Sequence, residues 1–274
     1  MEHKNFRIIS KLNDTSDAVR IACMYIEKAC EELGMTYAPV AVYSEGGIVF
    51  AVGGDGTMIE AMKQSAGTNA IVVGVNMGRV GFLTDVNIRN CGTNREFADF
   101  IKQVVQSKDS TSTERMLLIN NLRPNILAMN EYTVSANRPD GLVEYTLWID
   151  EFCAGTHRAN SVIISTPTGS TAYSLSAGGS IMMPELEAIQ ITPVAAMSMT
   201  SRSIIVGAES KVAIQVKQSV FLNCDGQRIS HYDAVDKTPI RFEFQAADRK
   251  VRVLHNEGWN FFHVLSEKLG WNNK

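Results

Sequence analysis

A glycine-rich turn between an apolar strand and a helix constrains this chain more than any other feature. Ile48–Val52 is a continuous apolar run of strand length, and Gly53-Gly54-Asp55-Gly56-Thr57 follows it directly. Asp-Gly is a common hairpin signal, but residues 58–66 continue at helical spacing, which favours a strand–turn–helix unit over a hairpin. Glycines let a ligand approach the backbone, and the N–H groups at a helix start attract anions. The turn is therefore expected to cradle a phosphate group and to offer the Asp55 carboxylate as a base.

The first third of the chain alternates strand and helix patterns. Strand-like apolar runs cover residues 5–10, 48–52 and 70–75, and helical spacing covers 18–33, behind the capping candidates Thr15 and Ser16, and 97–105. Continuous apolar strands that alternate with helices are typical of a parallel sheet. We therefore expect an α/β domain with a parallel sheet over residues 1–112.

From about Arg115 the pattern changes to strand-length segments with little helix between them. These segments are MLLIN, NILAMNEYTVSA, VEYTLWIDEF, SVIIS, SIIVG, KVAIQV, SVFLN, IRFEF and KVRVL. Such a series indicates a C-terminal all-β domain over residues 113–257. The tail WNFFHVLSEKL predicts a helix within residues 258–274, and its periodicity does not say where that helix docks.

Composition narrows the class of protein further. The 274 residues carry a net charge of −3 without a concentrated stretch of Lys and Arg, so no nucleic-acid partner is expected. The N-terminus lacks the apolar segment of a secretory signal, and no apolar run reaches the roughly 20 residues of a membrane span, so no membrane partner is expected either. Five scattered cysteines without a Cys-x-x-Cys pair argue against a disulfide framework or a zinc site and favour a cytoplasmic location.

Two further segments place polar side chains next to apolar strands. Residues 165–173 (STPTGSTAY) carry hydroxyl groups at six of nine positions, which suits a neutral polar ligand surface such as a base or a ribose. Composition alone would equally fit a flexible Ser/Thr-rich linker. Asn130-Glu131 lies inside the apolar segment NILAMNEYTV, and neighbouring side chains of a strand point to opposite faces. At least one of the pair should thus be structural or solvated, unless the strand ends there.

In combination these segments closely resemble the NAD kinase family. GGDGT looks like the glycine-aspartate motif that this family shares with diacylglycerol, sphingosine and phosphofructokinase relatives, and Asn130-Glu131 matches its Asn-Asp/Glu motif. STPTGSTAYSLSAGG (residues 165–179) matches the most distinctive family signature almost letter for letter. GVNMGRVGFLTD (residues 74–85) looks like the substrate loop, and Asp225-Gly226-Gln227 looks like the late Asp-x-Gln turn. The likeness runs from about Val49 to Gln227 in the expected order.

The resemblance implies a fold and a reaction. It implies an active site between an α/β and a β domain, often completed by a neighbouring subunit, so a homodimer or homotetramer is expected. The γ-phosphoryl group of ATP, or polyphosphate in some members, would pass to the adenosine 2′-hydroxyl of NAD to give NADP. Asp55 would be the general base, and Mg²⁺ would arrive on ATP without a dedicated metal site in the protein.

The resemblance also implies the ligand-binding residues. Asn130 and Glu131 would hold the ribose, and Phe82 would lie against the adenine. The adenine and ribose pockets would be lined by Thr171, Ala172, Tyr173 and Ser176. The segment that approaches the nicotinamide half would contain His157, Arg158 and Asn160. The complete set is Gly53, Gly54, Gly56, Thr57, Asn76, Phe82, Asn130, Glu131, His157, Arg158, Asn160, Thr171, Ala172, Tyr173, Ser176 and Gln227.

Departures from the family pattern cluster on the nicotinamide side. Asn160-Ser161 stands where the family usually has Asp-Gly, and further differences fall at Ser180, Ala196-Met197 and Arg202-Ser203. The phosphoryl-transfer motifs are intact, so a divergent working enzyme is favoured. Two alternatives stay open: a lipid kinase of the diacylglycerol type, which would share GGDGT, and a non-catalytic NAD(H)-binding sensor. The intact Asp55 argues against the sensor.

Overall fold

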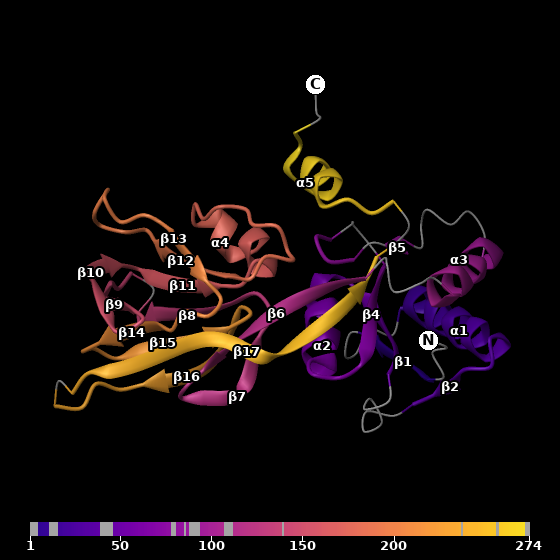
Figure 1. The fold of residues 1–274 in the computed structure, drawn as a ribbon, viewed down its shortest axis with the longest axis horizontal. Coiled ribbons are helices and arrows are strands. Elements are labelled where there is room, and N and C mark those ends of the chain that lie inside the picture. Colours follow the sequence, from indigo (N-terminus) through magenta and orange to yellow (C-terminus); the bar gives the residue numbers. More distant parts are fainter. Residues whose placement is uncertain are drawn as a thin grey trace. The chain divides into compact units, whose positions relative to one another are not determined.

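The computed structural model describes residues 5–10, 16–38, 46–77, 81–84, 86–87, 94–106, 112–138, 140–236, 238–255 and 258–271. The chain folds into two compact units, shown in Figure 1. Unit 1 comprises Met1–Arg115 and Lys250–Lys274, and unit 2 comprises Met116–Arg249. The sequence-based domain bounds, residues 1–112 and 113–257, stay a prediction. Thr15, Cys91 and four residues of the expected substrate loop (78–80 and 85) lie outside the described residues.

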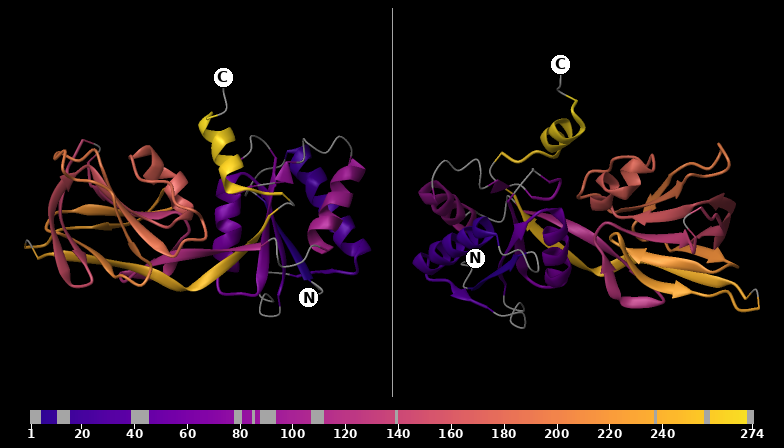
Figure 2. Two further views of the ribbon diagram at one scale, coloured as in Figure 1. Left: turned by 45° about the horizontal axis from the view of Figure 1, so that its top comes forward. Right: turned by 180° about the vertical axis from the view of Figure 1, so that it is seen from behind.

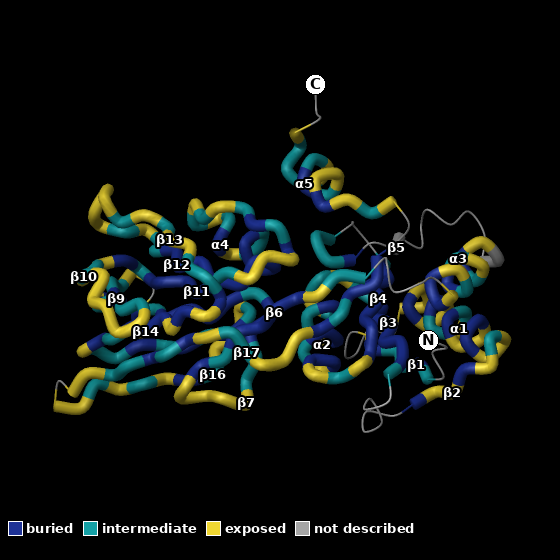
Figure 3. The backbone as a smooth tube through the Cα atoms, viewed as in Figure 1, coloured by how far each residue is buried: buried dark blue, intermediate teal, exposed yellow. Residues whose placement is uncertain are grey.

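Unit 1 is built on a parallel sheet, as the sequence predicts. Its strands are β1 (Asn5–Ser10), β2 (Thr36–Tyr37), β3 (Gly47–Gly53), β4 (Ala70–Asn76) and β5 (Val86–Asn87), and β3 pairs in parallel with both β1 and β4. The end of β17 (Ile240–Leu254) adds a further parallel strand beside β4. All of β4 and nearly all of β3 are buried (Figure 3), which explains their continuous apolar sequences.

Helices cover both faces of this sheet. Helices α1 (Asp17–Glu32) and α3 (Asn94–Gln106) pack on one face, and α2 (Asp55–Ser65) lies on the other (Figure 2). Ser16 occupies the position before α1, but its side chain makes no capping hydrogen bond to the helix. The C-terminal helix α5 (Phe261–Leu269) also belongs to unit 1, and the side chain of Asn260 caps it by accepting from the N–H groups of Phe262 and His263.

Unit 2 is built from antiparallel strands, which confirms the expected β domain. Strands β8 (Glu131–Ala136), β11 (Ser161–Ser165), β12 (Ala188–Val194), β13 (Ile204–Gly207), β15 (Val220–Cys224) and β16 (Gln227–Tyr232) form a six-stranded sheet in the order β13-β12-β11-β8-β15-β16. The other strands are β6 (Ser112–Asn120), β7 (Arg123–Ala128), β9 (Val143–Ile149), β10 (Phe152–Ala159), β14 (Val212–Val216) and the first part of β17. Large buried side chains, including Tyr132, Phe242 and Phe244, form one core between these layers.

Three details of unit 2 differ from the sequence prediction. NILAMNEYTVSA is not one strand, because the chain leaves β7 after Ala128 and re-enters a sheet at Glu131. IRFEF and KVRVL are not two strands, because the polar residues between them contain no Gly or Pro and continue as the single strand β17. Strands β10, β12 and β16 were not predicted; β10 is largely exposed and lacks a clear apolar alternation.

The short connections of unit 2 are helical where the hydroxyl-rich signature lies. A 3₁₀ turn, η4 (Thr168–Thr171), and the one-turn helix α4 (Tyr173–Ser176) follow β11. Among the described residues, no helix of the protein is long and apolar enough to cross a membrane.

Candidate active site

The glycine-aspartate turn joins β3 to α2, and its carboxylate is fixed by backbone donors. Gly54 occupies the N-cap position and Asp55 lies in the first turn of α2. Oδ2 of Asp55 accepts a hydrogen bond from the N–H of Phe82 at 3.0 Å, and Oδ1 accepts one from the N–H of Leu83 at 3.1 Å. An ionised carboxylate has about four lone-pair sites, so each oxygen keeps one for a further donor. Half-buried Asp55 is thus oriented and still able to accept a proton.

Two close approaches explain why this turn and the loop after β4 each need a glycine. A Cβ atom on Gly53 would lie 2.4 Å from Oγ1 of Thr57, and a Cβ atom on Gly81 would lie 1.8 Å from Oδ1 of Asp55. Both distances are far below a normal contact. Any larger residue at position 81 would therefore displace the carboxylate or the backbone that holds it.

Asn76 and the turn share one edge of the parallel sheet. Gly53, at the end of β3, stands opposite Asn76, at the end of β4, and Asn76 is buried. Ligands of open α/β sheets bind outside the carboxyl ends of the strands. Phe82, in the loop that follows β4, also lies near α5, with Nζ of Lys268 5.9 Å from its ring. The residues assigned to unit 1 therefore gather at the expected edge.

In unit 2, the Asn130–Glu131 pair lies where the chain passes from β7 to β8. The carboxylate of Asp225 binds three consecutive N–H groups there: Oδ1 accepts from Asn130 at 2.7 Å and from Glu131 at 3.2 Å, and Oδ2 accepts from Met129 at 3.1 Å. The N–H of Asp225 in turn donates to the carbonyl of Glu131 at 3.0 Å. The pair is thus held by a residue from a distant part of the sequence.

Glu131 has the most perturbed carboxyl group of the candidate site. It is 4% exposed, and one of its oxygens accepts the N–H of Tyr173. Its Oε2 atom is buried and has no hydrogen-bond partner within the described part of the chain. Burial, and secondly the charge of Asp225, raise the pKa of Glu131 to about 7, against the smaller lowering by the Tyr173 N–H. The carboxyl group can therefore take up or release a proton near neutral pH.

The hydroxyl-rich signature packs directly onto this pair. The N–H of Thr166 donates to the carbonyl of Asn130 at 2.9 Å, and the Thr166 hydroxyl donates to the carbonyl of Met129 at 2.6 Å. A Cβ atom on Gly169 would lie 2.1 Å from the carbonyl oxygen of Asn130. Residues 161–170 are all buried, so the flexible-linker alternative is wrong.

The remaining candidates of the adenine and ribose set follow the same segment. Thr171 and Ala172 are half-buried after η4, whereas Tyr173 and Ser176 in α4 are exposed. Gln227 is exposed at the start of β16, directly after the Asp225-Gly226 turn. The Thr171 hydroxyl donates to the Thr168 carbonyl at 3.3 Å, whereas the side chains of Tyr173, Ser176 and Gln227 are open to solvent.

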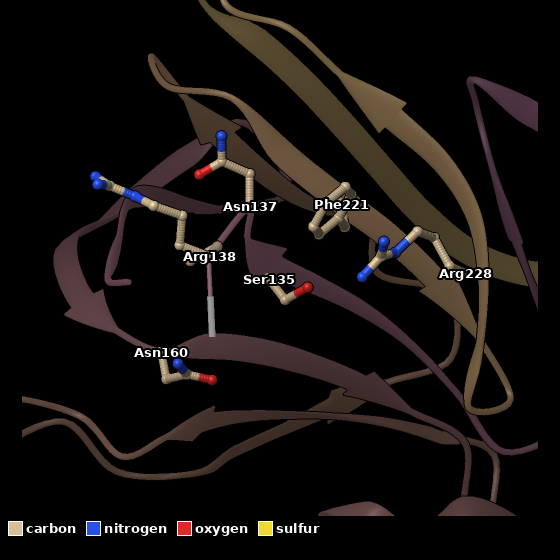
Figure 4. A pocket seen from close by; sticks show the side chains of 7 residues that line it. Ser135, Asn137, Arg138, Asn160, Phe221 and Arg228 are labelled. Carbon is tan, nitrogen blue, oxygen red and sulfur yellow. The ribbon is translucent and has the colours of Figure 1, made fainter. Parts of the chain in front are cut away.

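The three candidates of the nicotinamide segment contact other groups. Nδ1 of His157 lies 3.1 Å from the Ser201 hydroxyl, Arg158 forms an exposed ion pair with Glu144 at 3.7 Å, and Nδ2 of Asn160 donates to the Gly141 carbonyl at 3.0 Å. Asn160 lines a cavity of about 350 Å³ together with Ser135, Ala136, Asn137, Arg138, Phe221 and Arg228 (Figure 4). The Arg228 guanidinium lies 3.5 Å from the Phe221 ring centre.

Two residues of the site lie in motifs quoted from the sequence but were given no role there. Gly81 is the backbone position that lets the loop reach Asp55, and Asp225 organises Asn130 and Glu131. A sequence signal existed for Asp225, since Asp-Gly between two apolar strands predicts a tight turn. Over the described ranges, no group of three or more His, Cys, Asp or Glu side chains has the arrangement of a metal site.

A parallel α/β unit with a carboxylate in its glycine-rich turn and a β unit with an Asn-Glu pair whose carboxyl group is buried define the class of NAD kinase/diacylglycerol kinase-like phosphotransferases. Family models match the chain twice, as ATP-NAD kinase N-terminal domain over residues 41–107 and as ATP-NAD kinase C-terminal domain over residues 129–255. The NAD kinase of Wigglesworthia glossinidia brevipalpis is 33% identical over 83% of this chain and 76% of the relative, and that of Shewanella frigidimarina is 34% identical over 83% and 73%. This chain belongs to the NAD kinase family.

Solved structures share the fold at lower sequence identity. Yeast NADH kinase, complexed with NADH, aligns with a TM-score of 0.80 at 22% identity, over 100% of this chain and 89% of that one. An NAD kinase from Archaeoglobus fulgidus, in complex with ATP, aligns with a TM-score of 0.75 at 22% identity, over 97% and 98%. The predicted fold class is confirmed.

Proposed function

We propose that this chain transfers the γ-phosphoryl group of ATP to the adenosine 2′-hydroxyl of NAD, giving NADP and ADP. The observation that carries the proposal is the Asp55 carboxylate, which two backbone N–H groups orient at the end of β3 in a chain of the NAD kinase family. The names of the relatives support NAD as the acceptor, and the ATP complex of the Archaeoglobus relative supports ATP as the donor.

Asp55 acts as the general base. A hydroxyl group is a poor nucleophile at neutral pH, so its proton must leave as the new bond to phosphorus forms. Asp55 takes that proton on a lone pair that the Phe82 and Leu83 N–H groups leave free. The 2′-oxygen then forms its bond to the γ-phosphorus while the bond to the bridging oxygen of ADP breaks. Fixing the carboxylate beforehand lowers the barrier, because it needs no reorientation during the reaction.

The charge of the transferred group is compensated by the backbone and by the substrate itself. Gly53, Gly54 and Gly56 let phosphate oxygens approach the start of α2, whose first N–H groups attract anions. The N–H of Thr57 already donates to the Gly54 carbonyl at 3.0 Å. Mg²⁺ would arrive as part of the Mg-ATP substrate and would neutralise phosphate charge. Asp55 is the one carboxylate of the turn, and both of its oxygens accept backbone N–H groups, which fits a metal carried by ATP.

NAD is bound by the remaining candidate residues. Asn130 and Glu131 bind the ribose hydroxyls, and the unpartnered Oε2 of Glu131 supplies an acceptor for one of them. Phe82 and residues 171–176 contact the adenine and ribose. Asn76 and Gln227 contribute polar contacts, and residues 157–160 approach the nicotinamide half. The protein works in the cytoplasm as a homodimer or homotetramer.

The test is an incubation of the purified chain with Mg-ATP and NAD, followed by detection of the product with an NADP-specific dehydrogenase. NADP formation supports the proposal. Calorimetric binding of NAD without NADP would support the sensor alternative, and phosphorylation of lipid acceptors on thin-layer plates would support the lipid kinase. Replacing ATP by polyphosphate identifies the donor, and light scattering of the same preparation gives the oligomeric state.

A further inference from the structure

The turn between β15 and β16 carries a side chain that points back into the chain, not toward solvent. Asp225 and Gly226 both adopt positive φ, 46° and 76°, which is the backbone of a tight type I′ hairpin turn. A positive φ is uncommon for residues other than glycine and is tolerated best by Asn and Asp. In this conformation the Asp225 carboxylate reaches the passage from β7 to β8.

The Asp225 carboxylate serves N–H groups at a gap between two strands. Strand β7 ends at Ala128 and β8 begins at Glu131, so the N–H groups of residues 129 and 130 fall between the strands. Asp225 accepts from these two and from Glu131, at 2.7 to 3.2 Å. Hydrogen bonds to an ionised acceptor are roughly twice as strong as neutral ones, so three on one carboxylate fix the local backbone firmly.

We propose that Asp225 is a positioning residue for NAD binding: it fixes the backbone from which the Asn130 and Glu131 side chains project, and it places a negative charge beside Glu131. The inference rests on the proposed role of this pair at the ribose. Oδ1 of Asp225 accepts two backbone N–H groups, and Oδ2 accepts one N–H group and the Cys224 thiol at 3.8 Å. All four lone-pair sites of this carboxylate are therefore occupied, so Asp225 acts through the pair.

The elements packed around Glu131 differ in the charged groups that they bring near its carboxyl group. Ser165 of β11, which pairs with Glu131 in the sheet, is uncharged, and α4 contributes the Tyr173 N–H. The charged group facing Glu131 from the β15–β16 turn is Asp225. Tyr132 and Cys224 lie nearer to Asp225, and the pKa of Tyr132 is raised, mainly by burial, so its hydroxyl stays neutral. Removing the Asp225 charge should therefore lower the pKa of Glu131 from about 7.

The two effects of an Asp225→Asn substitution oppose each other, and their sizes decide the outcome. Asn tolerates the positive φ and keeps one acceptor oxygen, but its amide group faces an N–H donor, so the pair loses its fixed geometry. We expect roughly tenfold weaker NAD binding at pH 8 from this loss. A lower pKa also ionises more of Glu131. At pH 7 about half of this carboxyl group is already ionised, so its ionised fraction, and with it NAD binding, can rise by about twofold. The deficit should thus shrink as the pH falls toward 6.

The experiment combines two measurements on the full-length chain. NAD binding is measured by calorimetry at pH 6, 7 and 8, and the carboxyl group of Glu131 is titrated by ¹³C NMR without NAD, with Glu131→Gln to assign its signal. Asp150→Asn is the matched control, because Asp150 also has a positive φ of 48° and accepts the Lys211 N–H at 2.7 Å, but lies in the β9–β10 turn. Asp225→Glu keeps the charge and moves the carboxylate by one methylene group.

The inference predicts a lower Glu131 pKa and a pH-dependent binding deficit in Asp225→Asn, neither in Asp150→Asn, and a binding deficit with a near-normal pKa in Asp225→Glu. An unchanged Glu131 titration together with normal NAD binding in Asp225→Asn overturns it. If Asp225→Asn does not fold, normal NAD binding by Asp225→Glu overturns the positioning role. Wild-type protein that binds no NAD contradicts the proposed function instead, and the NMR titration still tests the control of Glu131.

Discussion

The two units each hold one functional carboxyl group, and they hold it in opposite ways. In unit 1, half-buried Asp55 has both oxygens bonded to backbone N–H groups of the loop after β4. In unit 2, Glu131 is 4% exposed, has one oxygen on the Tyr173 N–H and leaves the other without a partner among the described residues. Both oxygens of Asp55 thus have hydrogen-bond donors, whereas Glu131 is buried and one of its oxygens lacks a donor among the described residues.

This difference indicates a separate role for each of the two carboxyl groups. A general base must be correctly aimed before the substrate reacts, and the two backbone donors fix the direction of the Asp55 carboxylate. A binding group gains most when the ligand completes its hydrogen bonds, because a buried acceptor without a donor costs about 1–3 kcal/mol. These properties support the proposed roles of Asp55 in the chemical step and of Glu131 in NAD binding.

The largest expected effect tests the proposed role of Asp55 in unit 1. Asp55→Asn keeps the shape of the side chain and removes the base, so turnover should fall roughly 10²- to 10⁴-fold while NAD still binds. Steady-state kinetics with Mg-ATP and NAD measure the loss. Asp17→Asn is the control, since Asp17 also lies in the first turn of a helix but is 84% exposed. A mutant at position 55 with near-normal turnover would remove Asp55 from the mechanism.

Two glycine substitutions test the comparison further, because each displaces the candidate residues of one unit only. Gly81→Ala places a methyl group against Oδ1 of Asp55, and a displacement of about 1 Å can cost 10²-fold, so kcat should fall by about that factor. Gly169→Ala presses on the Asn130 carbonyl and should raise KM for NAD more than it lowers kcat. Parallel kinetics of both variants provide the measurement. Equal effects of the two on kcat and KM would show that the units do not divide the tasks.

The local elements of both units could be predicted from sequence, because short-range patterns encode them. The apolar run from Ile48 to Val52 and the glycines after it define β3 and the start of α2 without help from other segments. The signature STPTGSTAY likewise predicts an ordered polar surface, although its composition could not exclude a linker, and its role as a ligand surface stays a prediction.

The contacts that complete the site could not be predicted, because they join distant segments. The Phe82 and Leu83 N–H groups reach Asp55 across 27 and 28 residues, and Asp225 reaches Asn130 across 95. The same long-range contact explains the missed interruption between β7 and β8, where the sequence NILAMNEYTV reads as one strand. The length of β17 was missed for the opposite reason, since its polar middle is held by strand pairing at both ends.

A third prediction concerns ribose binding in unit 2. Asn130→Ala and Glu131→Ala each remove one hydrogen-bonding group from the ribose site, at a cost of roughly 1–3 kcal/mol. The effect should appear mainly as a higher KM for NAD, measured at pH 8, where Glu131 is mostly ionised. The control is Glu151→Gln, at a side chain that is 84% exposed. A crystal structure with NAD bound away from Glu131 would contradict this assignment.

The raised pKa of Glu131 also predicts a pH-dependent stability. The folded-state value of about 7 exceeds the ordinary 4.5, so the folded protein binds more protons than the unfolded chain between these limits. Stability should therefore decrease as the pH rises from about 4.5 to 7. Glu131→Gln removes this loss and should raise the free energy of unfolding at pH 8, by at most roughly 3 kcal/mol, with little gain at pH 4.5. Denaturant titrations at the two pH values measure the free energy of unfolding. An equal change at both pH values would show that the raised pKa of Glu131 is not the cause.

The smallest expected effect concerns the nicotinamide segment. NAD carries a positive ring charge that NADH lacks, so a carboxylate at position 160 should favour NAD by several-fold, and this effect should shrink in high salt. Asn160→Asp tests this through the ratio of kcat/KM for the two acceptors at low and high salt. The wild-type amide, which donates to the Gly141 carbonyl, should discriminate weakly. An unchanged ratio would show that position 160 does not sense the ring charge.

The division of labour between the two carboxyl groups is tested most directly by one paired measurement. Asp55→Asn and Glu131→Gln are prepared side by side, and each is measured for its dissociation constant for NAD and for its rate of NADP formation at saturating NAD and Mg-ATP. The account predicts that Asp55→Asn binds NAD normally and forms NADP at least about 10²-fold more slowly, whereas Glu131→Gln binds NAD more weakly and keeps most of its rate at saturation. Normal NAD binding by Glu131→Gln, or an unchanged rate in Asp55→Asn, would contradict it.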